Sequence, residues 1–390
     1  MAAHLPQVRK SEPNGVMYRD DFLNVDFGLI PTGDHNTAHA PALIETHDGG
    51  MLCAWFAGSF EGSGDISIVV SKLDPETQIW SVPQTISQGK DRSEQNPAFF
   101  RAPDGQIWLI YTSQLSRQAG KDNMQFTSII MVQKSNDEGN TWGDPEVLFA
   151  SEGTFSRQAI QILSNGRWLF STWLCEDSPE GLTNDPTEFQ LSDDQGKTWR
   201  AVRMPESNGR VHANVVEVAD GHLLAFMRSR FADHVYTSES FDYGDSWSIP
   251  EANTLPNNNA SISAIKLQSG EIALAYNMNA ANQAEFGKVT WPGLRNPVVV
   301  SVTEDLGKTW PLGRIFEPAE GYIGIENKTN NSQFEYPTLY QDQQGTLHLV
   351  YAYKNRLCIK YVRFTVEDLF GKKREAEGLY NPTSGEGVKK

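Results

Sequence analysis

The sequence has few cysteines, no long apolar run and a deficit of positive charge. Its three cysteines, Cys53, Cys175 and Cys358, are scattered, which argues against a disulfide framework or a cysteine metal site and indicates reduced core thiols. No run of about 18 apolar residues occurs, so no membrane-spanning helix is predicted. The formal net charge of −16 makes nucleic acid and anionic membrane unfavourable partners. An acidic ligand remains compatible, because a few arginines in a cleft outweigh a remote negative surface.

Signals for targeting and for metal or cofactor binding are also missing. The first 14 residues are polar and contain no apolar segment of the kind that secretion signals have. We therefore expect a cytoplasmic protein, or a secreted one whose signal peptide lies outside this sequence. The histidines show no metal-ligand spacing with a third donor, so neither a metal nor another cofactor is expected.

One short pattern, Ser-x-Asp-x-Gly-x-Thr-Trp, occurs four times with small variations. The pattern is typical of a hairpin turn in which the Asp side chain bonds turn amides and Gly supplies a positive φ. The Trp is expected to fill the gap between neighbouring sheets, and the boxes are expected to be structural. Repeats at this spacing indicate a repeat architecture. The copies span 135–142, 192–199, 240–247 and 303–310, with a degenerate fifth at 71–80.

Around these boxes the sequence pattern indicates six similar units of short strands. Each unit opens with two apolar runs separated by a glycine turn, and in the first five units a box follows after a third run. This predicts an all-β protein, a six-bladed β-propeller of four-stranded antiparallel blades. The last unit shows three strands ending near Phe364, so the segment 17–30 is expected to supply the fourth and close the ring. We expect one propeller domain over 1–369 and a C-terminal tail over 370–390.

Polar residues open the innermost strand of every unit. In a propeller these strand starts surround one end of the central channel, and such a polar ring suits a hydroxyl-rich, charged ligand better than a dry core. The six strand starts are Asp34–Pro41, Glu94–Pro97, Ser156–Gln158, Arg210–Asn214, Asn257–Ser261 and Glu335–Pro337.

The boxes and several strand starts make the chain similar to the sialidase superfamily over roughly residues 35–365. The resemblance implies a general acid at Asp65, a carboxylate-binding arginine at Arg228 and a nucleophilic tyrosine at Tyr336. Arg295 is a weaker match to a further arginine of that family. The matching segments are His39-Ala40-Pro41, Gly62-Ser63-Gly64-Asp65, Val215-Val216-Glu217, Phe226-Met227-Arg228 and Tyr336 at the start of the sixth inner strand.

Two positions depart from the family pattern. His39 stands where the first substrate-binding arginine of the family is expected, and His212 stands where a glutamate is expected. A free tyrosine is a poor nucleophile near neutral pH and needs an activating neighbour, a role that His212 could take. Both histidines could instead form structural hydrogen bonds, and Asp65 could be a turn cap.

The candidate residues form two groups. Each has a plainer structural alternative, such as an internal ion pair for Arg157. The catalytic candidates are Asp65, Tyr336, His212 and His39, and the substrate-binding candidates are Arg228, Arg157, Arg295 and His35.

Three functions fit these residues. The first is an exo-acting glycoside hydrolase for a terminal acidic sugar, with an acidic oligosaccharide or glycoside as substrate. The second is a lyase that cleaves a uronate-containing oligosaccharide, such as a rhamnosyl-glucuronate, by β-elimination. The third is a sugar-binding propeller without catalysis. In all three, the loops 112–128, 175–188 and 278–294 are expected to set specificity.

Overall fold

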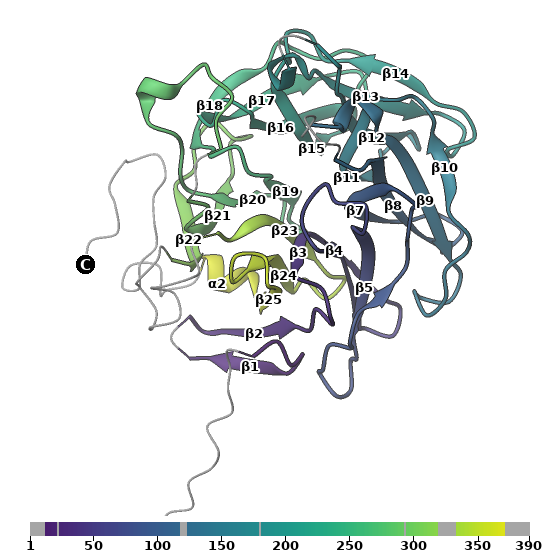
Figure 1. The fold of residues 1–390 in the computed structure, drawn as a ribbon. Coiled ribbons are helices and arrows are strands. Elements are labelled where there is room, and N and C mark those ends of the chain that lie inside the picture. Colours follow the sequence, from purple (N-terminus) through teal and green to yellow (C-terminus); the bar gives the residue numbers. More distant parts are fainter. Residues whose placement is uncertain are drawn as a thin grey trace, which may run out of the picture.

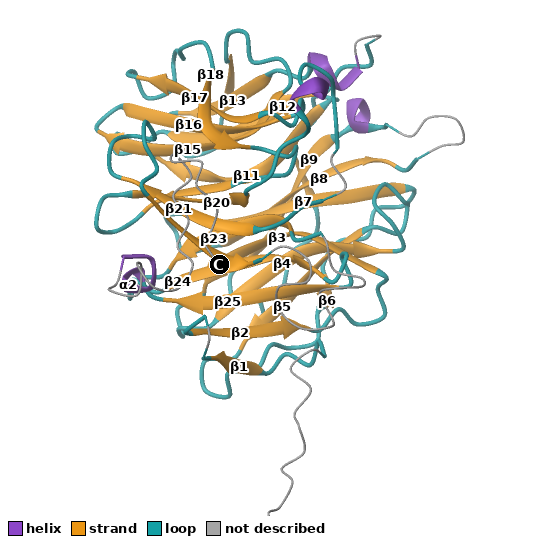
Figure 2. Cartoon of the chain, turned by 90° about the vertical axis from the view of Figure 1, so that its left-hand side faces the viewer, coloured by secondary structure: helices purple, strands orange, loops and turns teal. Residues whose placement is uncertain are grey.

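The computed structural model describes residues 12–21, 23–117, 123–178, 181–291, 294–318 and 333–370. The described chain consists almost entirely of strands and loops, with a few short helices (Figure 2). The predicted tail after residue 370 lies outside the described residues. The short helices are η1 (Gln125–Thr127), η2 (Gly181–Asn184), η3 (Gln283–Glu285) and α2 (Val366–Phe370).

The strands form six antiparallel sheets arranged as the blades of a ring, which confirms the predicted β-propeller (Figure 1). The innermost strands are β3 (Thr37–Glu45), β7 (Arg92–Arg101), β11 (Thr154–Ile162), β15 (Arg210–Ala219), β19 (Ser263–Lys266) and β23 (Glu335–Gln341). The second strands are β4 (Met51–Gly58), β8 (Ile107–Leu115), β12 (Trp168–Leu174), β16 (His222–Ser229), β20 (Ile272–Asn277) and β24 (Leu347–Tyr353).

The outer strands complete the blades. The third strands are β5 (Ser67–Leu73), β9 (Ile129–Ser135), β13 (Thr187–Ser192), β17 (His234–Ser240), β21 (Val298–Thr303) and β25 (Cys358–Phe364). The fourth strands of blades one to five are β6 (Gln84–Thr85), β10 (Glu146–Phe149), β14 (Arg200–Arg203), β18 (Glu251–Pro256) and β22 (Leu312–Glu317).

The N-terminal segment completes the sixth blade. β2 (Val25–Ile30) pairs antiparallel with β25, from Asp26 opposite Arg363 to Ile30 opposite Ile359. This is the pairing that the sequence analysis expected for this segment. β1 (Met17–Asp20) adds a fifth strand outside β2, so this blade has one strand more than the predicted four (Figure 1). The ring is thereby closed by strands from both ends of the described chain.

The hydrophobic core is divided among the six gaps between neighbouring blades. In the gap where the ring closes, Leu43 and Trp55 of blade one pack with Val350 and Tyr361 of blade six and with Ile30 of β2. Similar clusters fill the other five gaps. The three cysteines are buried and free, as the composition predicted. Closing the ring therefore covers each blade on both faces.

The repeated boxes form the same turn in each copy. In blade two the carboxylate of Asp137 accepts hydrogen bonds from the Thr141 amide at 2.8 Å and the Thr141 hydroxyl at 2.6 Å. The Gly139 amide donates to Ser135 Oγ at 2.9 Å, and both Glu138 and Gly139 have positive φ. Blades three, four and five repeat these contacts. The turn therefore needs two consecutive left-handed residues, where the sequence suggested only the glycine.

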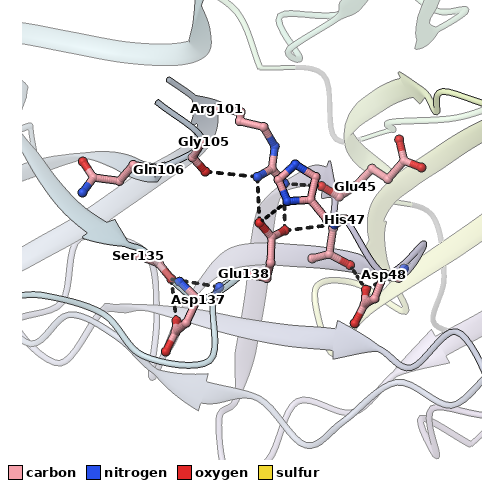
Figure 3. A network of polar contacts seen from close by, with 12 residues as sticks. Glu45, His47, Asp48, Arg101, Gly105, Gln106, Ser135, Asp137 and Glu138 are labelled. Atoms are coloured by element: carbon pink, nitrogen blue, oxygen red, sulfur yellow. Dashed lines mark hydrogen bonds and ion pairs between the residues drawn. The ribbon is translucent and has the colours of Figure 1, made fainter. Parts of the chain in front are cut away.

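The boxes also join blades on their side of the ring. Arg101 of blade two donates two hydrogen bonds of 2.9 Å to Glu138 of the box turn and one of 2.8 Å to the Glu45 carbonyl of blade one (Figure 3). The His47 amide, also of blade one, donates to Glu138 at 3.0 Å. The inner strands end on this side, so their starts lie at the opposite mouth of the channel.

Candidate functional site

Five inner strands are interrupted near their start by a register shift, and in blade five the left-handed residue Asn259 precedes β19. In five blades the residue at this point is not glycine and has a positive φ, a conformation that costs free energy and is concentrated at functional sites. In blade three Arg157 lies at the equivalent bulge of β11. The other five residues are Ala40 (φ 54°), Asn96 (φ 51°), His212 (φ 57°), Asn259 (φ 58°) and Tyr336 (φ 54°).

A cavity of about 300 Å³ lies at this mouth of the channel. Tyr336 and His212 line it from the bulges, and Arg228 lines it from β16. The remaining wall comes largely from the loops that join the second and third strand of each blade. They include Glu61 in blade one, Met124 in blade two, Leu182 in blade three, Arg230 in blade four, Trp291 in blade five and Arg356 in blade six.

Tyr336 and Arg228 form the centre of the cavity. Arg228 Nη1 donates a 2.6 Å hydrogen bond to the Tyr336 hydroxyl, and Arg228 Nε donates a 2.7 Å bond to Asn259 Oδ1. Only 3% of Arg228 and 8% of Tyr336 is exposed. No carboxylate among the described residues pairs with Arg228, so its charge faces the phenolic oxygen and the cavity.

His212 is held as a neutral ring beside this pair. Its Nε2 lies 3.3 Å from Arg228 Nη1, which can only donate, so Nε2 accepts and Nδ1 carries the proton toward Ser261 Oγ at 3.1 Å. The ring stacks on Trp173 with 4.3 Å between centroids. Burial, followed by the charge of Arg228, lowers the pKa of His212 well below its usual value. His212 thus accepts from the arginine, and its nitrogens are already occupied rather than directed at the phenol.

A buried carboxylate, Glu335, organises the cations on the other side of Tyr336. Glu335 accepts a hydrogen bond from Arg356 Nε, and its carboxylate oxygens lie 3.1 Å from Arg295 Nη1 and 3.0 Å from His39 Nδ1. Arg356 also bonds Glu61 at 2.6 Å. Burial alone would raise the pKa of Glu335, but the charges of Arg295 and Arg356 hold it well below its usual range. Both carboxylates are therefore ionised, and they neutralise Arg295 and Arg356 while fixing their positions.

His39 lies behind the tyrosine and outside the residues that line the cavity. Its ring centroid is 4.2 Å from that of Tyr336, and only 1% of the residue is exposed. Burial lowers the pKa of His39 to about 4, so the ring is neutral near pH 7. The structure thus places His39 as a packing partner of the tyrosine ring, with its Nδ1 3.0 Å from a Glu335 carboxylate oxygen.

Three other sequence candidates also lie away from the cavity wall. Asp65 is exposed on the loop after β4, where Ser59 donates to its carboxylate from the amide at 3.0 Å and from the hydroxyl at 2.8 Å. This is the turn-capping geometry that was the structural alternative for Asp65. His35 precedes β3 and is half-buried. Arg157 lies deeper in the channel. Of the eight candidates, Tyr336, His212, Arg228 and Arg295 line the cavity.

Sequence reasoning did not select Glu61, Trp173 or Arg356, all of which line the cavity. Glu61 and Arg356 come from loops between second and third strands, and this position in each repeat was the available signal. Trp173 lies one residue before the end of β12, next to the cavity. The loops expected to set specificity do reach the site, through Met124, Leu182 and Trp291 among others. No group of histidine, cysteine and carboxylate residues that could hold a metal occurs in the described parts of the chain.

The comparisons with known proteins agree with this architecture. The family model for the BNR repeat-like domain matches residues 49–349. The chain belongs to the BNR repeat-like domain family. No similar sequence is found among curated proteins. No helix of the described BNR chain is long and apolar enough to cross a membrane.

Solved structures with this fold include several sialidases. The Hadza microbial sialidase Hz136 aligns with a TM-score of 0.68 at 17% identity, over 86% of this chain and 67% of that one. The NanB sialidase of Streptococcus pneumoniae aligns at 0.67 and 14% identity, over 92% and 71%. A protein of unknown function from Dyadobacter fermentans aligns at 0.65 and 17% identity, over 92% and 99%. At these low sequence identities the structural similarity shows a shared fold only.

Proposed function

We propose that this propeller is an exo-acting glycosidase for a terminal acidic sugar, with Tyr336 as the reacting group. The observation that carries the proposal is the buried 2.6 Å hydrogen bond from Arg228 to the Tyr336 hydroxyl inside the cavity. An arginine stabilises a negative charge on the phenolic oxygen and attracts a ligand carboxylate, and both effects are strong where water is excluded.

The cavity suits a small anionic ligand. Its volume of about 300 Å³ lies at the lower end of the range for small-molecule sites, which favours one terminal sugar over a long internal segment. Arg228, without a carboxylate partner among the described residues, leaves a net positive field at the centre of the site. Trp291, which is 48% exposed, adds apolar surface on which a sugar ring can rest.

In the hydrolytic reaction the Tyr336 oxygen attacks the anomeric carbon while the bond to the leaving oxygen breaks. The phenolic proton passes to solvent and the leaving oxygen takes a proton from water, so the sugar is held on the tyrosine. Water then attacks the same carbon, which releases the sugar with retained configuration and restores the phenol. Arg228 stabilises the tyrosine oxygen in the free enzyme and as it leaves in the second step.

The carboxyl groups near the site favour a second candidate, a uronate lyase. Burial acts to raise the pKa of Glu61, but the charge of Arg356 outweighs it and lowers that pKa to about 2. At Asp65, hydrogen bonds from Ser63 and Ser59 outweigh burial and also lower the pKa. Neither group is a ready acid for a leaving oxygen at neutral pH. β-Elimination needs no carboxylic acid, because an ionised Tyr336 could take the proton next to a carboxylate that Arg228 neutralises and return it to the leaving oxygen.

The test is incubation of the full-length protein with sialosides, uronosides and rhamnosyl-glucuronates. Hydrolysis adds the mass of water to the products, whereas elimination leaves the total mass unchanged and produces the ultraviolet absorbance of an unsaturated uronate. Under either reaction Tyr336→Phe should abolish most of kcat with little change in KM. Full activity of Tyr336→Phe would contradict both mechanisms and favour a binding protein.

Arg228→Ala is the companion variant. It removes a charge-assisted bond worth about 1.5–3 kcal/mol, so acidic ligands should bind roughly ten- to a hundredfold more weakly. Neutral sugars of the same size should lose much less. Isothermal titration with an acidic sugar and its neutral analogue, each in the Tyr336→Phe background, measures this difference without turnover.

A further inference from the structure

Arg157 crosses the central channel beneath the cavity. From the bulge of β11 in blade three its Nη2 donates to the Pro41 carbonyl at 2.9 Å and to Thr338 Oγ1 at 2.8 Å. Its Nη1 approaches the Pro97 carbonyl at 3.4 Å. These acceptors belong to blades one, six and two. A single side chain of blade three therefore contacts three other blades at the axis of the ring.

The charge of Arg157 has no opposite charge beside it. Only 4% of the residue is exposed, and its hydrogen-bond acceptors are two backbone carbonyls and a hydroxyl. Its Nε is buried without a hydrogen-bond partner. Within the described ranges no carboxylate pairs with it. Burial lowers the pKa of Arg157 to about 10, which still leaves it protonated at neutral pH. Burying a cation without a neutralising partner costs folding stability, so a functional role would explain why Arg157 is placed here.

The group that can supply a negative charge here is Tyr336. The guanidinium carbon of Arg157 lies 5.8 Å from the centroid of the Tyr336 ring. Arg228 and Arg295 lie at 5.5 Å and 5.7 Å from the same centroid. The ring also contacts His39 and His212, and Glu335 precedes it in the chain. Of the three arginines around Tyr336, Arg295 is neutralised by Glu335, whereas Arg157 and Arg228 bond only neutral groups.

Arg157 does not reach the front cavity in which a substrate would lie. It lines a separate cavity of about 380 Å³ at the rear of the channel, together with residues near the ends of the inner strands. Its influence on a substrate must therefore pass through Tyr336. The bonds to three blades fix the guanidinium in place, which is what a preorganised electrostatic group requires.

We propose that Arg157 is a positioning residue that stabilises the negative charge on Tyr336 from behind, while Arg228 does so from the substrate side. The proposal rests on the proposed function, in which Tyr336 is the reacting group. When the phenol releases its proton to solvent, the new negative charge meets two fixed cations. This arrangement takes over the activating task that the sequence assigned to His212, whose nitrogens are bound to Arg228 and Ser261.

The test compares two neutral replacements, Arg157→Met and Arg157→Gln, with the charged replacement Arg157→Lys in the full-length protein. Two quantities are measured across pH: kcat and KM on an acidic substrate that the wild type cleaves, and the ultraviolet difference absorbance of ionised tyrosine. Subtracting the titration of Tyr336→Phe isolates the signal of Tyr336. Circular dichroism identifies which neutral variants keep the fold.

In a neutral variant that folds we expect kcat to fall on the order of ten- to a hundredfold, with KM nearly unchanged. Tyr336 should ionise at higher pH, and the pH–rate profile should move in the same direction. Arg157→Lys should restore most of both properties. In the Tyr336→Phe background the Arg157 variants should cause no further loss of residual activity.

Two results would overturn the proposal. One is an unchanged ionisation of Tyr336 in a folded neutral variant. The other is an equal loss in Arg157→Lys and the neutral variants without a shift in pH, which would make Arg157 a structural brace only. Full activity of Tyr336→Phe is a different result, since it refutes the proposed function while the absorbance titration still decides the role of Arg157.

Discussion

At the scale of single residues, His212 shows how a contact changes an assignment. Its position favoured a general base, but Arg228 Nη1 occupies its Nε2 and Ser261 its Nδ1. The ring is buried and neutral, and it accepts a hydrogen bond from Arg228 and stacks on Trp173. An acceptor of similar size should therefore replace it better than a ring without nitrogen.

The prediction for His212 follows from this acceptor role. His212→Gln keeps an oxygen acceptor for Arg228 and should retain a substantial part of kcat, whereas His212→Phe leaves the arginine without that partner and should lose about tenfold more. Steady-state kinetics of both variants on one acidic substrate provide the measurement. If the two variants are equally inactive and the acidic limb of the pH–rate profile disappears in both, His212 acts as the base after all.

His39 provides a prediction for the pH dependence of stability. Its pKa is about 4 in the folded protein and about 6.5 when unfolded, because burial opposes protonation. Below pH 6.5 the unfolded chain therefore binds a proton that the folded chain does not. Stability is retained above pH 6.5 and decreases as pH falls from 6.5 toward 4, by roughly 3 kcal/mol for this residue.

Urea unfolding between pH 4 and pH 7.5 measures this dependence. His39→Gln should flatten the slope of the unfolding free energy against pH in that range. His47→Gln is the matched control, since His47 lies at the surface beside Glu138. A slope that stays the same in His39→Gln would show that other groups, such as buried His212, account for the acid sensitivity.

At the scale of elements, the boxes position the blades but lie far from the cavity. Asp242→Ala removes the acceptor for the Ser246 amide at 2.9 Å and for the Ser246 and Ser240 hydroxyls. Because this turn is near the surface, we expect a loss of about 1–2 kcal/mol in unfolding free energy. Thermal unfolding together with kinetics checks the prediction. A large change in KM with unchanged stability would contradict the separation of box and site.

The repeating elements are also what the sequence predicts best. Four boxes and six pairs of apolar runs led to the correct blades, because hydrogen bonds within each box are local. The cavity was predicted less completely, since its contacts join residues far apart in the chain. Glu335 lies close to Arg295, Arg356 and His39, which belong to three different segments of the chain. No spacing in the sequence predicts these contacts. Asp65 illustrates the opposite case, in which a family position is occupied by a residue that caps its own turn.

At the scale of the whole molecule, ring closure depends on both ends of the described chain. β2 pairs with β25 over five residue pairs, and Ile30 packs in the gap between blades six and one. Nearby, the Ala38 amide of blade one donates to the Arg356 carbonyl of blade six at 2.6 Å. Closure therefore stabilises the loop that carries Arg356 and so connects the N-terminal strands to the cavity.

This connection yields the last prediction. Removing residues 1–30 deletes β1 and β2, leaves β25 as an unpaired edge and uncovers the apolar gap between blades six and one. Exposed edges and apolar gaps promote association, so the truncated chain should aggregate or unfold well below the full-length protein's melting temperature. A truncation that begins at Met17 keeps both strands and is the matched control. Size-exclusion chromatography and thermal unfolding of the two truncations test whether β2 is needed to close the ring. If the protein without residues 1–30 stays monomeric and keeps its melting temperature, β2 is not needed.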